Sequence, residues 1–178
     1  MERTLVSEQS RLDFTPRAVG SGSAVPPAEM SADRPTVACT RAVLLLDRVH
    51  AAAAGALDGH NSSVVSAALA SRLLTFLEGH LAAFRYTSPG GLRLKRDLAE
   101  YSRMLQAWGL SPSSIAQTRL AELGALANLL VAPRPALTGL LSGEGLGLAV
   151  SREDSLRFVA LRDDYRRNDK AFSQLAGL

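Results

Sequence analysis

Histidine and cysteine side chains are the first candidates for a metal site or a nucleophile, and this sequence contains few of them. His50, His60 and His80 are isolated from one another and from acidic pairs, with no H-x-x-x-H or comparable ligand spacing. Each is interpreted as a helix-surface or capping residue. Cys39 is the single cysteine, has no nearby histidine partner in sequence, and is interpreted as a buried, inert thiol. We therefore predict no metal-ligating and no catalytic residues.

Two acidic pairs and a glycine-rich run also have structural interpretations. Glu153 and Asp154 lie in the expected first turn of a helix, where the macrodipole favours negative charge. Asp163 and Asp164 flank arginines on an expected exposed face. The run SGEGLGLAV has Leu148 where a G-x-G-x-x-G phosphate loop needs glycine, and no G-K-[ST] follows. It is interpreted as a flexible connection, so we predict no cofactor and no enzymatic activity.

The segment AEYSRMLQAWGLSPSSIAQTRLAEL permits an alternative, a DNA-binding helix-turn-helix. Its second helix would expose Ser113, Gln117, Thr118 and Arg119 after a glycine-containing turn. Against this, that helix continues into the apolar run ALANLLVA, and αα-hairpins use the same turn residues. The net charge of +3, from 20 basic and 17 acidic residues, is too small to indicate a nucleic-acid partner.

Membrane contact and targeting have little support. Arg93, Lys95 and Arg96 form the densest basic cluster and could touch acidic lipid headgroups, but a solvated helix face is the favoured interpretation. The most apolar region, residues 125–150, is interrupted by polar residues and prolines, so no transmembrane helix is predicted. The N-terminal stretch MERTLVSEQSRLDF lacks the apolar run of a secretory signal, and its acidic residues argue against a transit peptide.

Length and composition favour one all-α domain. The chain has 178 residues, and 47% of them are hydrophobic, which is enough for a core. Aromatic residues make up only 5% while leucine and alanine dominate, a balance that suits helix packing better than pleated sheet. Residues 1–35, rich in Ser, Pro, Gly and Ala, are predicted to be a disordered tail. Residues 36–178 are predicted to form an α-helical bundle of about five helices, with no sheet.

Apolar periodicity places the first two helices at residues 36–57 and about 62–84, with Leu57-Asp58-Gly59 between them. Gly79 lies inside the second helix, where it costs about 1 kcal/mol relative to alanine. The predicted inward residues are Ala38, Ala42, Leu45, Val49, Ala52 and Ala56 in the first helix, and Leu69, Leu73, Phe76, Leu77, Leu81 and Phe84 in the second.

Three further helices are expected. The third, at residues 92–108, follows the break Ser88-Pro89-Gly90-Gly91 and is the most clearly amphipathic. The fourth begins at a Ser114–Gln117 capping box and is stopped by Pro133 and Pro135; a short apolar piece at residues 136–141 then leads towards a last helix at residues 151–175. The predicted inward residues are Leu94, Leu98, Tyr101, Leu105 and Trp108, then Ala116, Leu120, Leu123, Ala127 and Leu130, then Phe158, Leu161, Tyr165, Phe172 and Leu175. The predicted outward residues of the third helix are Arg93, Arg96, Asp97, Glu100 and Arg103.

The third helix also carries a family resemblance. Gly90-Gly91-Leu92, Asp97-Leu98, Glu100-Tyr101, Leu105 and Trp108 together resemble the GGL…DL.EY…L..W stretch of the exocyst complex component 5 family. The similarity continues in the same order from residue 57 to residue 166. It includes Leu57-Asp58-Gly59, Asn61, Arg72, His80, Phe84 and Tyr86, then Asn128-Leu129-Leu130-Val131, Pro133, Leu137 and Ser142-Gly143-Glu144, and finally Phe158-Val159, Leu161-Arg162 and Asp164-Tyr165-Arg166.

This resemblance implies the C-terminal helical bundle of a non-catalytic vesicle-tethering subunit, in a complex that holds secretory vesicles at the plasma membrane before fusion. Its helices would bind other exocyst subunits, with component 6 the expected partner, and it would be cytoplasmic and peripheral at the membrane through the complex. It implies no cofactor, no nucleic acid and no small-molecule substrate. Because family members are several times longer, it also implies a fragment whose first helix would expose apolar faces. The rival hypotheses are the DNA-binding module and a stand-alone helical regulator.

Overall fold

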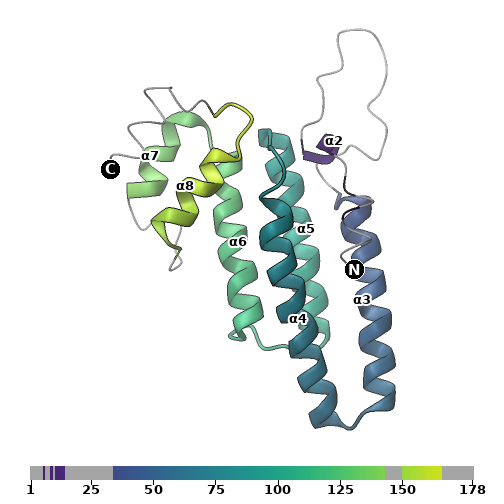
Figure 1. Ribbon diagram of the computed structural model, residues 1–178. Coiled ribbons are helices and arrows are strands. Elements are labelled where there is room, and N and C mark those ends of the chain that lie inside the picture. Colours follow the sequence, from purple (N-terminus) through teal and green to yellow (C-terminus); the bar gives the residue numbers. More distant parts are fainter. Residues whose placement is uncertain (1–5, 7–8, 10, 15–33, 143–149, 166–178) are drawn as a thin grey trace.

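The computed structural model describes residues 6, 9, 11–14, 34–142 and 150–165. Within them the long helices α3 to α6 run side by side, the shorter α7 follows the end of α6, and α8 packs against α6 (Figure 1). The prediction of an all-α bundle is confirmed, since the described residues contain one isolated bridge, between Tyr86 and Arg162, and no strand. The described helices are α2 (Arg11–Phe14), α3 (Val37–Ala56), α4 (Gly59–Leu81), α5 (Ser88–Ala107), α6 (Ile115–Val131), α7 (Arg134–Ser142) and α8 (Arg152–Ala160).

Side-chain caps set where most of these helices begin. In each case a side-chain oxygen accepts a hydrogen bond from the backbone N–H three residues later. Asp58 caps α4 in this way, so that helix begins at Gly59, earlier than the predicted residue 62. The capping residues are Thr36, Asp58, Thr87, Ser114 and Ser151.

The expected break at Ser88-Pro89-Gly90-Gly91 is wrong, because these four residues form the first turn of α5. Thr87 caps the helix, and Pro89 is tolerated in the first turn, where its missing N–H would have no helical partner. The two glycines, Gly90 and Gly91, lie where neighbouring segments come close to the α5 backbone. A Cβ on Gly90 would lie 1.8 Å from the Phe14 carbonyl oxygen, and one on Gly91 would lie 2.9 Å from the Leu130 Cβ. Glycine here lets α2 and α6 approach α5.

The core is centred on α5, which packs against α2, α3 and α6. The predicted inward residues Leu94, Leu98, Tyr101 and Leu105 are buried, while Trp108 is half-buried. The predictions for the neighbouring helices also hold in large part. In α4, Leu73, Leu77 and Leu81 are buried and Leu69 and Phe76 are half-buried, as is Phe84 just after the helix. In α6, the predicted inward residues are all buried: Ala116, Leu120, Leu123, Ala127 and Leu130.

The inward face predicted for the first helix is wrong over most of its length. Ala38 and Ala42 are buried as expected, and Cys39 and Leu46 join them. The other predicted inward residues lie on the exposed side of α3; these are Leu45, Val49, Ala52 and Ala56. The helix carries two apolar stripes, and only one of them has a neighbour among the described helices.

The prediction of a disordered tail is wrong for residues 11–14, which form α2 against α5. The Phe14 side chain is fully buried, with its ring centroid 5.2 Å from that of Phe84 and 4.8 Å from that of Tyr86. The buried Phe14 ring, the Asp13–Arg93 ion pair and the hydrogen bonds from Thr87 to the Phe14 carbonyl together attach this turn to α5. The remainder of the predicted tail lies outside the described residues, apart from residues 6, 9, 34 and 35.

The last helix ends at Ala160, much earlier than the predicted residue 175. After it the backbone pairs with Tyr86, whose N–H donates to Leu161 O and whose carbonyl accepts from Asp163 N, both at 2.9 Å. The Arg162 guanidinium then caps α6, donating to Leu129 O and Ala132 O, each at 2.7 Å. Phe158, Leu161 and Tyr165, predicted to point inward, are half-buried, whereas the buried apolar residue of α8 is Val159. Phe172, Leu175 and the glycine-rich connection lie outside the described residues.

Proline does not leave the α6–α7 region unstructured. Pro133 follows the end of α6 as expected, but α7 begins at Arg134 and contains Pro135 in its first turn. The short apolar piece predicted at residues 136–141 is therefore the body of α7, and Leu137 is its buried residue.

Among the helices that the structure describes, one, α4, is long and apolar enough to cross a membrane by length and composition alone, whereas the sequence predicts no transmembrane helix. A third of that window is buried inside the bundle. Core helices of bundles pass the same test, and here Leu73, Leu77 and Leu81 pack into the common core. Packing within the bundle accounts for the buried third of this window.

Candidate interaction surface

A buried polar cluster joins α2, α3 and α5, and it overturns part of the predicted outward face. Arg93 and Asp97 were expected to be largely exposed, but both are buried. Asp97 accepts hydrogen bonds from Thr36 N at 2.7 Å and from Thr36 Oγ1 at 2.8 Å. Arg93 forms an ion pair with Asp13 at 3.2 Å. These contacts hold the start of α3 and the α2 turn to α5, so the cluster is structural.

Burial controls the ionisation of this cluster. Desolvation raises the pKa of Asp97 to about 7, although the hydrogen bonds from Thr36 and the nearby Arg93 charge act in the opposite direction. Burial also raises the pKa of the Cys39 thiol well above its usual range. Its Sγ donates to Asp97 O at 3.6 Å. The interpretation of Cys39 as a buried thiol is confirmed, and a thiol with a raised pKa is a poor nucleophile.

His80 does not lie on the helix surface as predicted. It is half-buried between two rings of its own chain segment, with centroids 5.2 Å from Phe76 and 5.0 Å from Phe84. Its Nε2 is buried without a hydrogen-bond partner. Desolvation lowers the pKa of His80, so the neutral imidazole acts there as an aromatic packing residue.

The other histidines have no shared site. His50 stacks on Trp108 with centroids 4.6 Å apart and planes 2° from parallel, and Trp108 Nε1 donates to Asp47 Oδ1 at 2.8 Å. These contacts fasten the middle of α3 to the end of α5. His60 is exposed near the start of α4. Among the described residues, no three His, Cys, Asp or Glu side chains form a group that could hold a metal ion.

The acidic pairs have different roles. Glu153 and Asp154 lie in the first turn of α8, as predicted, and Asp154 N donates to the Ser151 cap at 3.0 Å. Asp163 and Asp164 follow that helix, contrary to the expectation of a helix face. The Arg162 guanidinium donates to the Asp164 carboxylate at 2.8 and 3.0 Å, and this contact lowers the pKa of that carboxyl.

The helix-turn-helix alternative is not favoured, because one of the four residues expected to face DNA is buried. Gln117 was expected to face DNA, but it is buried, donating through Nε2 to Ser102 O at 2.9 Å and accepting from Ser102 Oγ at 2.7 Å. Only half of the predicted capping box forms, because the Gln117 side chain turns to α5 while its N–H donates to Ser114 Oγ at 3.3 Å. Arg119 pairs with Glu78 and Glu122 at 3.1 and 2.8 Å. Gln117 therefore packs against α5 and Arg119 forms ion pairs at the surface, while Ser113 and Thr118 are exposed as expected.

The predicted basic cluster on α5 does not form one surface. Arg93 is buried against Asp13, while Lys95 Nζ donates to Asn128 Oδ1 of α6 at 2.7 Å. Arg96 is exposed. Two of the three cations therefore hold helices together, which leaves no compact basic patch at this position for acidic headgroups.

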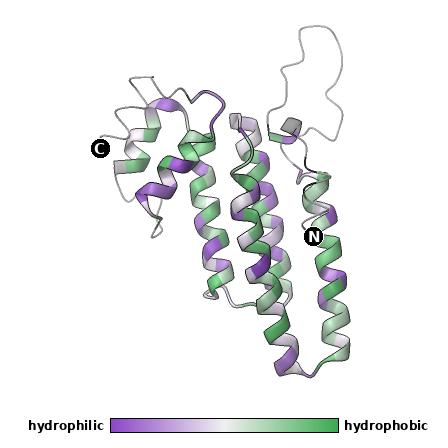
Figure 2. Cartoon of the chain, in the orientation of Figure 1, coloured by the Kyte–Doolittle hydropathy of each residue, from purple (hydrophilic) through white to green (hydrophobic). Residues whose placement is uncertain are grey.

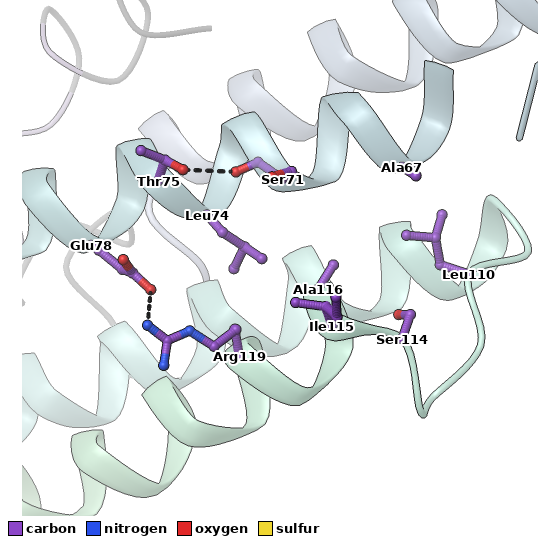
Figure 3. A pocket seen from close by; sticks show the side chains of 10 residues that line it. All are labelled: Ala67, Ser71, Leu74, Thr75, Glu78, Leu110, Ser114, Ile115, Ala116 and Arg119. Atoms are coloured by element: carbon purple, nitrogen blue, oxygen red, sulfur yellow. Dashed lines mark hydrogen bonds and ion pairs between the residues drawn. The ribbon is translucent and has the colours of Figure 1, made fainter. Parts of the chain in front are cut away.

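A groove lies between α4 and the start of α6. Figure 3 shows Glu78 and Arg119 facing each other across one end of it, with Leu74 on the wall formed by α4 and Ile115 on the opposite rim. Its volume is about 450 Å³. A second pocket of about 630 Å³ begins at the same ion pair and continues between α6 and α8, past Leu126 and Phe158. The two pockets have mixed polar and apolar walls and no convergent set of catalytic groups among their described lining residues.

Among the described helices, α3 carries the most exposed large apolar side chains. Figure 2 shows apolar residues along most of this helix, which stands at one edge of the helical layer. Its exposed large apolar residues are Val37, Leu44, Leu45 and Val49, and Leu57 and Val64 follow in the turn and in α4. Such an edge is typical of a surface that packs against another protein.

Comparison with known proteins decides the family. A family model described as "Exocyst complex component Sec10-like, alpha-helical bundle" matches residues 1–172. The chain belongs to this Sec10-like exocyst family. Exocyst complex component 5 of Oryza sativa subsp. japonica is 37% identical over 166 residues, which cover 93% of this chain and 19% of that protein. Exocyst complex component SEC10a of Arabidopsis thaliana is 37% identical over 166 residues, covering 93% and 18%.

A more distant relative in the same Sec10-like family is exocyst complex component SEC10 of Saccharomyces cerevisiae. It is 24% identical over 165 residues, which cover 93% of this chain and 17% of that protein. The chain thus spans about a fifth of the length of the plant relatives it matches. The resemblance inferred from the third helix and the segments around it is confirmed.

Proposed function

We propose that this chain is a non-catalytic part of an exocyst subunit and acts, with the other subunits, in docking secretory vesicles at the plasma membrane. The observation that carries the proposal is the match to the Sec10-like helical-bundle model over residues 1–172. The exposed apolar edge on α3 supports a role in protein–protein contact. In this role the chain uses no catalytic, cofactor-binding or metal-ligating residue.

The proposed partners are other exocyst subunits, with component 6 first among them. The chain would be cytoplasmic and would reach the vesicle or plasma membrane peripherally, through the complex. The folded helical domain, proposed at residues 36–178, would supply the contact surface, with α2 fastened to it through Phe14.

Affinity capture from cell extract tests this function, with the tagged chain as bait and an unrelated helical bundle of similar size as control. We expect mass spectrometry to find other exocyst subunits enriched with the chain and not with the control. Their absence from the captured material would refute the proposal. A parallel titration with double-stranded DNA tests the rejected alternative, since DNA binding would weaken steeply as salt rises.

A further inference from the structure

The residues between α4 and α5 are held from two sides by segments that are distant in sequence. Tyr86 N donates to Leu161 O and the Tyr86 carbonyl accepts from Asp163 N, both at 2.9 Å. Thr87 has an extended backbone, and its N–H donates to Phe14 O at 3.0 Å. Successive N–H groups of an extended chain point to opposite edges, so the segment after α8 lies along one edge of this connection and α2 lies along the other.

Phe14 also packs on the aromatic side chains of this connection. Its ring centroid lies 4.8 Å from that of Tyr86 and 5.2 Å from that of Phe84. Tyr86 is 1% exposed, and its hydroxyl donates to Leu81 O at 2.9 Å. A single backbone bridge is marginal without side-chain packing. The Phe14 ring therefore helps to keep Tyr86 in the position where its backbone pairs with the segment after α8.

The segment after α8 joins three helices. The Arg162 guanidinium donates to two carbonyl oxygens at the end of α6, each at 2.7 Å, and to the Asp164 carboxylate. Asp164 in turn forms an ion pair with Arg134 of α7 at 3.4 Å. Leu161 is part of the wall of the pocket between α6 and α8. We call residues 161–164 the α8 joint, because they connect α8 to α6 and α7.

We propose that α2 is a releasable strap: while Phe14 is in place, Tyr86 is held where it pairs with the α8 joint, and release of α2 loosens this joint and the pocket beside it. The two-state element is the connection between α4 and α5, which α2 and the α8 joint both contact. This inference goes beyond the proposed function, because it couples two parts of one chain whichever partner the chain binds. Such coupling is reciprocal, so loosening the α8 joint also weakens the attachment of α2.

The attachment of α2 is slight enough for a strap. Among its described contacts are the Phe14 ring, two hydrogen bonds from Thr87 to Phe14 O and the ion pair between Asp13 and Arg93. A single peripheral turn opens at a lower free energy than helices that share a core. In the proposed mechanism α2 therefore leaves its place while α3 to α6 stay folded.

Backbone hydrogen exchange measured by nuclear magnetic resonance tests the strap in the full chain. The Thr87 amide reports the attachment of α2, and the Asp163 amide reports the α8 joint. In Phe14→Ala both amides should exchange about tenfold faster than in the wild type, the size of a typical coupling between two sites. If the Thr87 amide quickens and the Asp163 amide does not, or if neither quickens, the inference is overturned.

Leu105→Ala is the matched control for general destabilisation. It also truncates a fully buried side chain, but Leu105 lies about 22 Å further along α5 than Gly90, far from the strap. Exchange of the Asp163 amide should quicken clearly less in Leu105→Ala than in Phe14→Ala. An equal effect of the two variants would show that α2 has no specific hold on the joint. Circular dichroism establishes that each variant is folded.

Asp13→Asn separates release of α2 from a cavity beside Tyr86. This substitution weakens the ion pair with Arg93 and leaves the Phe14 ring unchanged. Exchange at Thr87 and at Asp163 should quicken together, by less than in Phe14→Ala. Quicker exchange at Thr87 alone, or unchanged exchange at both amides, would overturn the inference.

The reciprocal experiment begins at the α8 joint. Arg162→Ala removes the contacts of the joint with α6, and it should quicken exchange of the Thr87 amide, which lies on the other edge of the connection. Asp164→Asn loosens the joint more mildly and replaces Arg162→Ala if that variant does not fold. The control is Arg157→Ala on the exposed side of α8, which should leave the Thr87 amide unchanged. A Thr87 amide that responds equally to the joint variant and to this control would show that the two attachments are independent.

Discussion

Replacing Gly90 by alanine should destabilise the bundle, although alanine is the better helix former. Gly90 lies in the first turn of α5, and a Cβ there would meet the Phe14 carbonyl carbon and oxygen at 2.5 and 1.8 Å. No side-chain rotation relieves this contact, because the obstructing atoms are backbone. The same carbonyl accepts from Thr87 N at 3.0 Å and from Thr87 Oγ1 at 3.1 Å, so α2 must move away and lose both bonds.

The size of the effect follows from what α2 contributes. Phe14 is fully buried, and exposing a phenylalanine side chain costs about 1.5–3 kcal/mol. Loss of the Arg93–Asp13 ion pair adds to this, because Arg93 remains enclosed without its carboxylate. Alanine in place of glycine returns about 0.5–1 kcal/mol through backbone entropy. We therefore expect Gly90→Ala to lower the free energy of unfolding by about 1–3 kcal/mol.

Urea denaturation followed by circular dichroism measures this change. Gly79→Ala is the matched control, since it also lies in a helix and its Cβ would meet nothing within 4 Å; it should stabilise the chain by about 0.5–1 kcal/mol. In a Phe14→Ala background, Gly90→Ala should cost less than in the wild type, because α2 has already lost its anchor. If Gly90→Ala were as stable as Gly79→Ala, the close approach of α2 to α5 would be refuted.

Three further predictions concern buried groups. The pKa of Asp97 is about 7 in the folded chain and near its ordinary value of about 4 in the unfolded chain. Asp97 therefore makes its full contribution to the free energy of unfolding below pH 4, and this contribution is lost as the pH rises through 7. Subtracting the unfolding free energies of Asp97→Asn from those of the wild type should show this decline; a flat difference would contradict it. Arg162→Ala should cost about 2–4 kcal/mol in urea denaturation by leaving carbonyls of α6 unpaired, whereas exposed Arg157→Ala should cost under about 0.5 kcal/mol. Cys39 should react with a disulfide reagent only after urea unfolds the chain, and rapid labelling of the native protein would show that the thiol is accessible.

The sequence predicts the buried residues well in helices that carry a single apolar stripe. In α5 and α6 the apolar residues recur every three or four positions and face the common core. Caps were predictable in part, because Ser114 and Ser151 have the side chains that accept from a first-turn N–H. In these elements local chemistry and long-range packing agree, so periodicity alone identifies the inward residues.

The prediction is wrong for polar residues that are buried because residues distant in sequence pair with them. The sequence pattern places Arg93 and Asp97 on a solvated face. In the folded chain, Asp13, 80 residues away in sequence, neutralises Arg93, and Thr36, 61 residues away, donates hydrogen bonds to Asp97. Periodicity carries no information about such partners. The Gly90-Gly91 pair was taken as a helix break for a related reason: the close approach of α2 and α6 that requires glycine is visible only in three dimensions.

When one helix carries two apolar stripes, the sequence does not show which of them is buried. On α3, Leu46 and Ala42 face the core while Leu45 and Val49 face solvent, although both sets have helical spacing. The end of α8 was missed because Leu161 and Tyr165 continue a helical pattern, while the backbone leaves the helix to pair with Tyr86. In both places the competing interaction involves a segment distant in sequence.

The motif that identified the family consists mainly of residues that build the fold. Gly90 and Gly91 admit α2 and α6, Leu98 and Leu105 fill the core, and Asp97 fastens α3. A motif of this kind can be shared by relatives that bind different neighbours, because none of these buried side chains reaches a partner. Under the proposed function, specificity for another subunit would therefore reside in exposed residues, most of which lie outside the motif. The exposed apolar residues of α3 form such a surface, so changes to Leu44 or Leu45 should alter partner choice while leaving the bundle intact.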